Sequence, residues 1–329
     1  MSTKIFITGG DGLLGSNLIR ELVKRGFSPR ILIQPERNSP TLNGLDIEKV
    51  PGDLLERGAK IKSAMEGCEV VFHCAAITNL WANPELVFKV NLEGTRKVLD
   101  SCLENKIQRL VFVGSASSFQ FGTKENPGDE TGAFPPIYRG MAYMESKHQA
   151  MKLVLEYVRK KGLDAVVVCP TFMLGDYDYG PSSGELIQQF IKMGLRYVSP
   201  GGRNFAYVRD VAQGMLSALE KGRTGQVYIM GGENLSYLEF FSQVAEIAGL
   251  SPPKASLPCP LILASGAFAS VYGKLRGKRS KFNLKMARLA CLGTYYSSEK
   301  AKRELDLPQT PVRKAIEESI NSLKRYGYI

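Results

Sequence analysis

The chain has 329 residues, 44% hydrophobic and 23% charged, a composition that indicates a folded globular protein and excludes extensive disorder. Its net charge of +11 suits an anionic ligand, but no aromatic–basic motif accompanies the charge to indicate nucleic-acid binding. The six cysteines form no Cys-x-x-Cys pair, and no His, Cys and acidic residues have metal-ligand spacing. We therefore expect core thiols in a reducing compartment and no metal catalysis.

Short apolar runs alternate with helical patterns up to about residue 175. The runs are apolar throughout, as strands covered on both faces should be, and occur at 4–7, 30–33, 70–76, 110–113 and 165–169. The helical stretches between them are 16–25, 54–65, 84–105 and 142–161. This alternation predicts an α/β fold with a Rossmann-type, doubly wound parallel sheet.

The regularity ends near residue 175, where a loop rich in Gly, Tyr, Asp, Ser and Pro follows. Further on, the patterns predict helices at 185–193, 207–221, 236–248 and 311–326, and a strand at 226–231. A smaller, irregular C-terminal substrate domain is expected. We assign 1–175 and about 204–231 to the parallel-sheet domain, and about 176–203 and 232–329 to the substrate domain.

The first predicted strand runs into a glycine cluster, Thr-Gly-Gly-Asp-Gly-Leu-Leu-Gly at 8–15, and a predicted helix follows. A strand, a tight glycine turn and a helix together place a helix N-terminus against a phosphate. Glycine is required because the turn visits positive φ and because a Cβ would block the approach of a pyrophosphate. The chain is therefore predicted to bind a dinucleotide with its first residues.

The choice between NAD and NADP depends on the end of the second strand. An acidic residue about 20 positions beyond the glycines commonly binds the ribose 2′-hydroxyl of NAD, but Gln34 stands there. Arg37 could bind a 2′-phosphate, which favours NADP over NAD. Glu36 keeps NAD open, and Arg37 could instead be a solvated loop charge.

Two further strand ends carry candidate cofactor contacts. Asp53 follows the third strand, where its carboxylate could hydrogen-bond the adenine edge, cap a helix, or do both. Ala75 and Ala76 end the fourth strand, and their small side chains would let the cofactor lie close.

Tyr-x-x-x-Lys occurs three times, beginning at Tyr143, Tyr157 and Tyr296. In the first pair, Tyr143 and Lys147 share a helix face, and an adjacent ammonium lowers a phenol pKa from about 10, which suits proton transfer at a carbonyl or hydroxyl carbon. This pair follows the fifth strand, whose end carries Gly-Ser-Ala-Ser-Ser at 114–118, and ligands of open α/β sheets bind beyond such strand ends. Tyr157 is predicted to be structural, and Tyr296 to lie far from any strand-end serine.

Together these motifs resemble the extended branch of the short-chain dehydrogenase/reductase superfamily. The resemblance covers about residues 3–250, and its motifs follow the family order at 8–15, 52–54, 73–76, 91–95, 143–147, 170–171 and 207–212. It implies that Tyr143 is the catalytic acid/base, that Lys147 lowers the Tyr143 pKa and binds the nicotinamide ribose, and that a serine completes the triad. Counting from the strand selects Ser115, whereas counting back from the Phe-Gly at 121–122 would select Ser117.

The same resemblance implies the remaining cofactor contacts. The expected set is Gly9, Gly12, Leu13, Leu14, Gln34, Arg37, Asp53, Leu54, Ala75, Ala76, Asn91, Lys147, Pro170 and Thr171. Asn91 matches a family asparagine that braces the site, although a helix cap or an interior hydrogen bond is an equal alternative.

Within that branch the chain is most similar to the dihydroflavonol reductase and 3β-hydroxysteroid dehydrogenase group. This implies interconversion of a ketone and a secondary alcohol on a bulky, lipophilic, steroid- or flavonoid-like substrate. A nucleotide-sugar epimerase or dehydratase is the alternative. A non-catalytic NADP-binding regulator is a third reading, but such relatives usually lack the Tyr/Lys pair. Tyr177 and Tyr179, in the loop 172–184, would suit a flat apolar substrate or a uridine base.

The segment 257–281 suggests a contact beyond the substrate. Residues 257–272 are mostly apolar, and five basic residues follow them: Lys274, Arg276, Lys278, Arg279 and Lys281. The stretch could line a lipophilic pocket, rest on a membrane surface, or form a buried helix with a basic edge. No run approaches the ~20 apolar residues of a membrane span, so we expect a cytoplasmic protein, with peripheral membrane contact as one option. The helices at 84–105 and 142–161 resemble a family dimer interface, which makes a homodimer a candidate.

Overall fold

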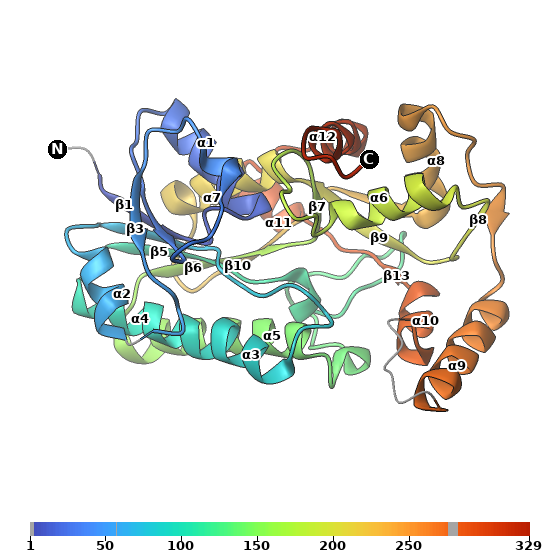
Figure 1. Ribbon diagram of the computed structural model, residues 1–329. Helices are drawn as coiled ribbons and strands as arrows, with labels where there is room; N and C mark the ends of the chain where they lie inside the picture. The colour runs from blue at the N-terminus through green and yellow to red at the C-terminus, as the bar shows by residue number, and fades with distance from the viewer. Residues whose placement is uncertain (1–2, 57, 276–281) are drawn as a thin grey trace.

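The computed structural model describes residues 3–56, 58–275 and 282–329. Seven parallel strands form one sheet in the order β10-β6-β5-β4-β1-β2-β3 (Figure 1). They are β1 (Ile5–Thr8), β2 (Arg30–Ile33), β3 (Glu48–Pro51), β4 (Val70–His73), β5 (Arg109–Val113), β6 (Ala165–Pro170) and β10 (Val227–Met230). The strand order reverses between β1 and β4, which is where a doubly wound sheet binds its ligand. The predicted Rossmann-type sheet is confirmed.

Helices cover both faces of this sheet. One face carries α1 (Leu13–Lys24), α7 (Val208–Lys221) and α11 (Glu299–Leu305), and the other carries α2 (Gly58–Met65), α4 (Thr95–Glu104) and α5 (Ala142–Lys161). Alternate residues of each strand enter separate cores. In β5, Leu110 and Phe112 pack toward α5, whereas Val111 and Val113 pack toward α7. Burial on both faces explains why the strands are apolar throughout.

The helices that carry the site residues differ in how well the sequence predicts them. Helix α5 has the predicted bounds and ends at Gly162, whose φ of 69° is left-handed. The single helix predicted at 84–105 is instead α3 (Pro84–Phe88), a π-helical turn (Lys89–Gly94) and α4. The helix predicted from residue 54 begins at Gly58.

A second, smaller sheet forms from strands that lie far apart in the sequence. Strand β9 (Gly202–Tyr207) pairs with β7 (Phe172–Leu174), β11 (Glu233–Ser236) and β13 (Gly293–Thr294), and β8 (Tyr197–Val198) pairs with β12 (Ala255–Ser256). A third core lies here, contributed by α6 (Gly184–Met193), α8 (Tyr237–Ala248) and α12 (Val312–Arg325). Helix α7 follows β9 directly, so one continuous segment links the two sheets. The exact domain limits stay a prediction.

The apolar stretch near residue 260 forms α9 (Cys259–Leu275), which packs against α10 (Leu284–Ala290) at one end of the molecule (Figure 1). It is not the buried helix of one interpretation, because Phe268 is 72% exposed. Of the basic residues that follow it, Arg276, Lys278, Arg279 and Lys281 lie outside the described residues. Within the described chain, every helix is too short or too polar to cross a membrane.

Candidate active site

The glycine turn after β1 is shaped for a ligand at the N-terminus of α1. Gly9 has a φ of +68°, and a Cβ there would lie 2.6 Å from the backbone of Ala75. At Gly12 an added Cβ would meet the Gly9 carbonyl oxygen at 3.5 Å, an ordinary contact, so the protein does not crowd this glycine. Gly12 is the N-cap of α1, and no side chain caps that helix. The turn therefore leaves backbone N–H groups free for a phosphate, which fits a dinucleotide.

Polar side chains connect the glycine turn to the ends of β2 and β3. Gln34 Nε2 donates to Asp53 Oδ2 over 2.6 Å, and Arg37 Nη1 donates to Gln34 Oε1 over 3.0 Å. Arg37 Nε also lies 2.5 Å from Asp11 Oδ2, within the turn itself. Sequence analysis missed Asp11, because its side chain comes next to Arg37, beyond the end of β2, only when the turn folds. Asp53 accepts from the Leu55 amide, in the turn before α2, which begins at Gly58.

The other predicted cofactor residues lie at three places around this turn. Leu14 and Leu54 are buried in the two cores that flank the sheet, and Leu13, the first residue of α1, is partly buried. Ala75 and Ala76 follow β4. Pro170 ends β6, and Thr171 Oγ1 donates to Asn204 Oδ1 over 2.7 Å, which ties this strand end to the small sheet.

The serine end of β5 meets the N-terminal turns of α5. The Ser115 hydroxyl is close enough to the Tyr143 phenol to lower its pKa, and Ser115 Oγ lies 2.8 Å from Ser117 Oγ. Ser117 thus contacts Ser115 rather than standing in its place. The geometry favours Ser115 over Ser117 as the residue that shares a reacting oxygen with Tyr143.

Lys147 is buried and does not point at the Tyr143 phenol. Its Nζ donates to the Val113 carbonyl and lies 4.8 Å from the centre of the Phe112 ring. Burial lowers the Lys147 pKa to about 8. Burial also raises the Tyr143 pKa, with the Ser115 hydroxyl opposing it. The expected lowering of the Tyr143 pKa by Lys147 is therefore not found in the protein alone: burial raises this pKa, and the group that opposes the rise is Ser115 rather than Lys147.

A chain of buried hydrogen bonds begins at the glycine turn. Thr8 Oγ1 lies 2.6 Å from His73 Nδ1, and His73 Nε2 lies 3.0 Å from Thr95 Oγ1. Burial, with the nearby Lys147 charge, lowers the His73 pKa to about 3. His73 is therefore neutral and joins β1, β4 and α4.

Asn91 continues this chain to α5. Thr95 Oγ1 donates to the Asn91 carbonyl over 2.7 Å. The Asn91 side chain pairs with both backbone groups of Ile77 and donates to Ser146 Oγ over 3.0 Å, and Ser146 Oγ donates in turn to the Tyr143 carbonyl. The π-helical turn that contains Asn91 aims this side chain away from its own helix. Asn91 thus braces the segment after β4 against the helix of Tyr143.

The two other tyrosine pairs have structural partners. Tyr157 is buried and its hydroxyl donates to Asp100 Oδ1 over 2.7 Å, so its structural interpretation is confirmed. The expectation that Tyr296 lies far from the strand-end serines is wrong, because its hydroxyl donates to the Phe119 carbonyl, just after Ser118. Sequence separation gave no measure of this distance, since β13 returns the chain to the site. Lys300 turns away to the Val227 carbonyl.

A cation surrounded by aromatic rings lies on the small-sheet side. Arg203 of β9 donates from Nε to the Tyr237 hydroxyl over 2.7 Å, and its guanidinium carbon lies 4.9 Å from the Phe172 ring centre. Tyr296 hydrogen-bonds Tyr138, and both phenols act electrostatically on Arg203. Among the described residues, the groups that raise the Arg203 pKa are tyrosine phenols and include no carboxylate. Sequence analysis missed this group because its members come from separate segments.

The loop tyrosines do not join that aromatic group. The Tyr177 ring lies 3.4 Å from the Arg20 guanidinium, and the Tyr179 ring packs edge-on against Tyr326. Both therefore attach the loop to α1 and to the end of α12. The expectation that they bind a flat substrate is not supported.

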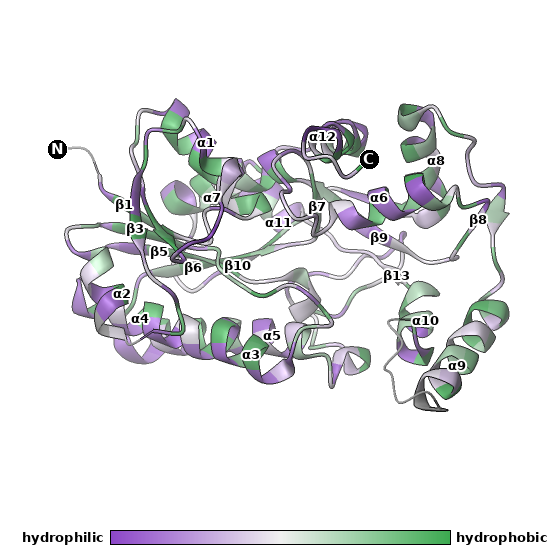
Figure 2. Ribbon diagram, viewed as in Figure 1, coloured by the Kyte–Doolittle hydropathy of each residue, from purple (hydrophilic) through white to green (hydrophobic). Residues whose placement is uncertain are grey.

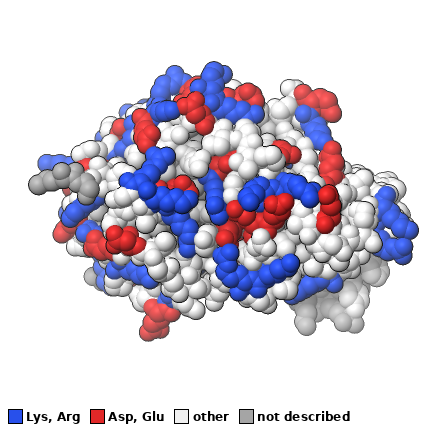
Figure 3. Space-filling model, turned by 90° about the horizontal axis from the view of Figure 1, so that it is seen from above, with Lys and Arg blue, Asp and Glu red and all other residues white. Residues whose placement is uncertain are grey.

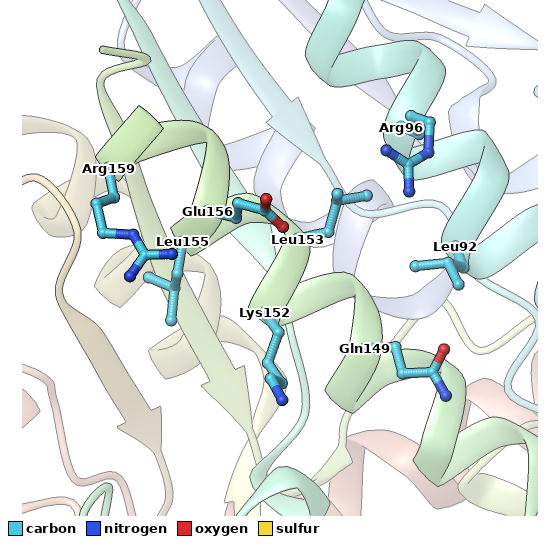
Figure 4. Close-up of a pocket in the computed structure, with 8 residues that line it drawn as sticks. All are labelled: Leu92, Arg96, Gln149, Lys152, Leu153, Leu155, Glu156 and Arg159. Carbon is cyan, nitrogen blue, oxygen red and sulfur yellow. The ribbon is translucent and has the colours of Figure 1, made fainter. Parts of the chain in front are cut away.

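A surface groove elsewhere contains none of the site residues (Figure 4). It lies along the outer face of α5, opposite the face of Tyr143 and Lys147. Its lining mixes apolar and charged side chains: Leu92, Arg96, Gln149, Lys152, Leu153, Leu155, Glu156 and Arg159. The groove belongs to the helix face predicted for a dimer, not to the chemistry.

The site just described therefore lies where four strands of the parallel sheet end. Gly9 follows β1, Ala75 follows β4, Ser115 follows β5 and Thr171 follows β6, while Tyr143 and Lys147 approach from α5. A dinucleotide on the glycine turn would extend along this row toward Ser115 and Tyr143. The residues present thus fit a nicotinamide dinucleotide.

Comparison with known proteins agrees with this geometry. The model of the NAD dependent epimerase/dehydratase family matches residues 5–231. A protein named "Putative dihydroflavonol 4-reductase" from Synechocystis sp. is 31% identical, covering 100% of this chain and 97% of its own length. "Sterol demethylase protein B" from Methylococcus capsulatus is 29% identical, covering 98% of this chain and 99% of its own.

A solved structure shares the whole fold. It is a nucleoside-diphosphate-sugar epimerase from Pseudomonas aeruginosa, 23% identical, which covers 100% of both chains with a TM-score of 0.82. At that identity the likeness concerns the fold alone. The family match spans more than half of the chain, and the first relative spans nearly all of it. The chain therefore belongs to the NAD dependent epimerase/dehydratase family, as an NAD(P)-dependent dehydrogenase or reductase of the extended short-chain type.

Proposed function

We propose that this enzyme interconverts a ketone and a secondary alcohol on a bulky, lipophilic substrate. The observation that carries the proposal is the row of strand ends that leads from the glycine turn to Ser115 after β5, where Tyr143 approaches from the first turn of α5. The names of the two relatives, a dihydroflavonol reductase and a sterol demethylase component, support a large polycyclic substrate rather than a sugar.

In this proposal each residue of the site has one task. Tyr143 donates its phenolic proton to the carbonyl oxygen in reduction and accepts it back in oxidation. Ser115 hydrogen-bonds the same oxygen and so fixes the carbonyl carbon. The bound dinucleotide supplies or accepts the hydride. The Lys147 ammonium adds a buried positive charge beside the site, and its own hydrogen bond to Val113 fixes its position.

The aromatic group around Arg203 is proposed to contact the substrate. Phe172 follows Thr171 directly, and Tyr296 reaches Phe119 at the serine end of β5, so the group adjoins the catalytic residues. Flat rings suit a polycyclic, apolar body. The Arg203 guanidinium, whose interacting groups among the described residues are tyrosine phenols, would bind a polar or anionic substituent of that body.

We also propose NADP rather than NAD as the cofactor. Arg37 lies at the end of β2 beside Gln34, the position at which this fold binds a ribose 2′-phosphate. Its present partner is Asp11, and a 2′-phosphate would compete for the same guanidinium.

A nucleotide-sugar epimerase is the second candidate, because family members of that kind share the fold. The two functions differ in cofactor stoichiometry. A reductase oxidises one NAD(P)H for each molecule of product, whereas an epimerase returns its cofactor to the starting oxidation state in every turnover.

The test is a cofactor-oxidation screen with ketosteroids, dihydroflavonols and nucleotide sugars. The proposal expects NADPH oxidation with a polycyclic ketone, abolished in Tyr143→Phe and retained in the matched control Tyr157→Phe. Conversion of a nucleotide sugar without net cofactor change would support the epimerase instead.

A homodimer through the outer faces of α4 and α5 completes the proposal. The groove in Figure 4 offers Leu92 and Leu155 between charged side chains, a surface that a second copy could cover. Sedimentation velocity of Leu155→Glu against the wild type tests it. The wild type should sediment as a dimer and the variant as a monomer, while a monomeric wild type would refute the dimer.

A further inference from the structure

Helix α9 presents an apolar face to solvent. We define this face by Leu261, Ala264, Phe268, Val271 and Tyr272, which recur at helical spacing along one side. Leu261 and Val271 are each 59% exposed, and Phe268 is 72% exposed with its ring stacked on Tyr272. Figure 2 shows the helix as largely hydrophobic although it lies at the edge of the molecule. Such a cluster on one helix is more than scattered surface exposure.

The opposite side of α9 packs firmly on α10. Gly266 lies so close to this helix that a Cβ would collide with Ala287. Ser270 Oγ accepts from the Leu284 amide over 2.9 Å, and Asn283 caps the start of α10. Because α9 packs on α10 through its other side, its apolar face points away from the protein.

The segment that contains this helix pair carries most of the excess positive charge. Residues 247–298 include no Asp or Glu but eight Lys and Arg, a charge of +8 out of the total +11: Lys254, Lys274, Arg276, Lys278, Arg279, Lys281, Lys285 and Arg288. Four of these, Arg276, Lys278, Arg279 and Lys281, lie outside the described residues. By contrast, acidic and basic side chains intermingle on the upper face of the molecule (Figure 3).

We propose that the apolar face of α9 docks on the surface of a lipid bilayer that contains anionic lipids. An exposed apolar helix face within a strongly basic segment is the combination that binds such a surface. A second copy of the chain fits less well, because a two-fold contact would bring two segments of +8 together. Helix α9 would lie on the bilayer rather than cross it, in keeping with its length of 17 residues.

The helix that supports the docking face contacts the segment before the catalytic helix. Lys285 of α10 donates to the Arg139 carbonyl, and residues 139–141 lead directly into α5 and Tyr143. Helix α10 therefore lies between the docking helix α9 and the start of the catalytic helix. This placement does not depend on which substrate the enzyme uses.

Co-sedimentation of the full chain with vesicles tests the proposal. We expect binding to phosphatidylcholine vesicles that contain phosphatidylglycerol, weaker binding to phosphatidylcholine alone, and release at high NaCl. Phe268→Asp and Leu261→Asp should each weaken binding by about tenfold or more, because each removes an inserted apolar side chain. Met193→Asp is the matched control, since Met193 is 58% exposed on α6, away from this face, and should bind like the wild type.

A charge variant separates the electrostatic contribution to vesicle binding from the apolar one. Lys254→Gln combined with Arg288→Gln, both exposed positions, should weaken binding to anionic vesicles while leaving pure phosphatidylcholine unaffected. Unchanged NADPH binding would show that each variant is folded. The proposal is overturned if the wild type ignores anionic vesicles, if Phe268→Asp binds as well as Met193→Asp, or if Phe268→Asp instead dissolves a dimer.

Discussion

In the parallel-sheet half, Ser115, Tyr143 and Lys147 lie within one strand–loop–helix unit, and a short motif places each of them. In the small-sheet half, Arg203 meets Tyr138, Tyr237 and Tyr296 from separate segments. The first half would hold the cofactor and the proton donor, and the second would hold the substrate. The residues proposed for the chemistry are therefore placed by local sequence, whereas the group proposed to contact the substrate is assembled from distant residues.

The sharpest contrast within the first half is between two tyrosines. Tyr143→Phe should reduce kcat by roughly 10²- to 10⁴-fold, the usual contribution of a general acid, with NADPH binding nearly unchanged. Tyr157→Phe should keep most of its activity, because its hydroxyl only bonds Asp100. Steady-state kinetics and fluorescence titration of NADPH measure both. If Tyr143→Phe remained active while Tyr157→Phe lost activity, the catalytic tyrosine would be Tyr157 rather than Tyr143.

A second pair separates the two serines at the end of β5. Ser115→Ala should lower kcat/KM by roughly tenfold to a hundredfold through loss of one hydrogen bond to a charged or developing oxyanion. Ser117→Ala should cost only a few-fold, since Ser117 contacts Ser115 and not the phenol. The reverse order in steady-state rates would transfer the role to Ser117.

Arg203 tests the substrate half of the comparison. Arg203→Met keeps the length of the side chain but removes its charge, and should raise KM for the substrate by about tenfold. It should leave NADPH binding unchanged, because Arg203 lies on the small sheet. An unchanged substrate KM together with a weakened cofactor would place Arg203 in the wrong half.

Arg37 tests cofactor choice. Arg37→Ala should raise KM for NADPH by about tenfold and leave KM for NADH nearly unchanged, since only the 2′-phosphate needs the guanidinium. Asp11→Asn is the companion variant and should improve NADPH binding, because it frees Arg37 from its ion pair. Equal effects of Arg37→Ala on both cofactors would refute the 2′-phosphate contact.

The smallest expected effect is a pH dependence. Burial lowers the Lys147 pKa to about 8, so the ammonium loses its proton as pH rises through about 8 rather than near its ordinary value. NADPH affinity should therefore be constant below that pH and fall by a few-fold above it, because a positive charge beside the site disappears. Lys147→Met should show a flat profile in the same fluorescence titration, and a wild-type profile with no break near pH 8 would contradict this assignment.

The sequence predicts local features of this molecule well and distant ones poorly. The bounds of α5 and the turn at Gly9 follow from periodicity and glycine spacing. The Asp11–Arg37 ion pair and the Tyr296–Phe119 contact join residues that only the fold brings together, so no spacing could indicate them. The direction of the Tyr143 pKa failed for another reason, because the sequence shows a neighbouring charge but not the extent of burial.

The central claim is that hydride transfer at Tyr143 gives a new carbinol. Reduction of a polycyclic ketone, once the screen has identified one, should be repeated with NADPH carrying deuterium at the transferred position. We predict one deuterium on the carbinol carbon for each NADPH oxidised in the wild type and in Tyr157→Phe, and formation of the same labelled product roughly 10²- to 10⁴-fold more slowly in Tyr143→Phe. Product without deuterium, or turnover without net oxidation of NADPH, would contradict the account.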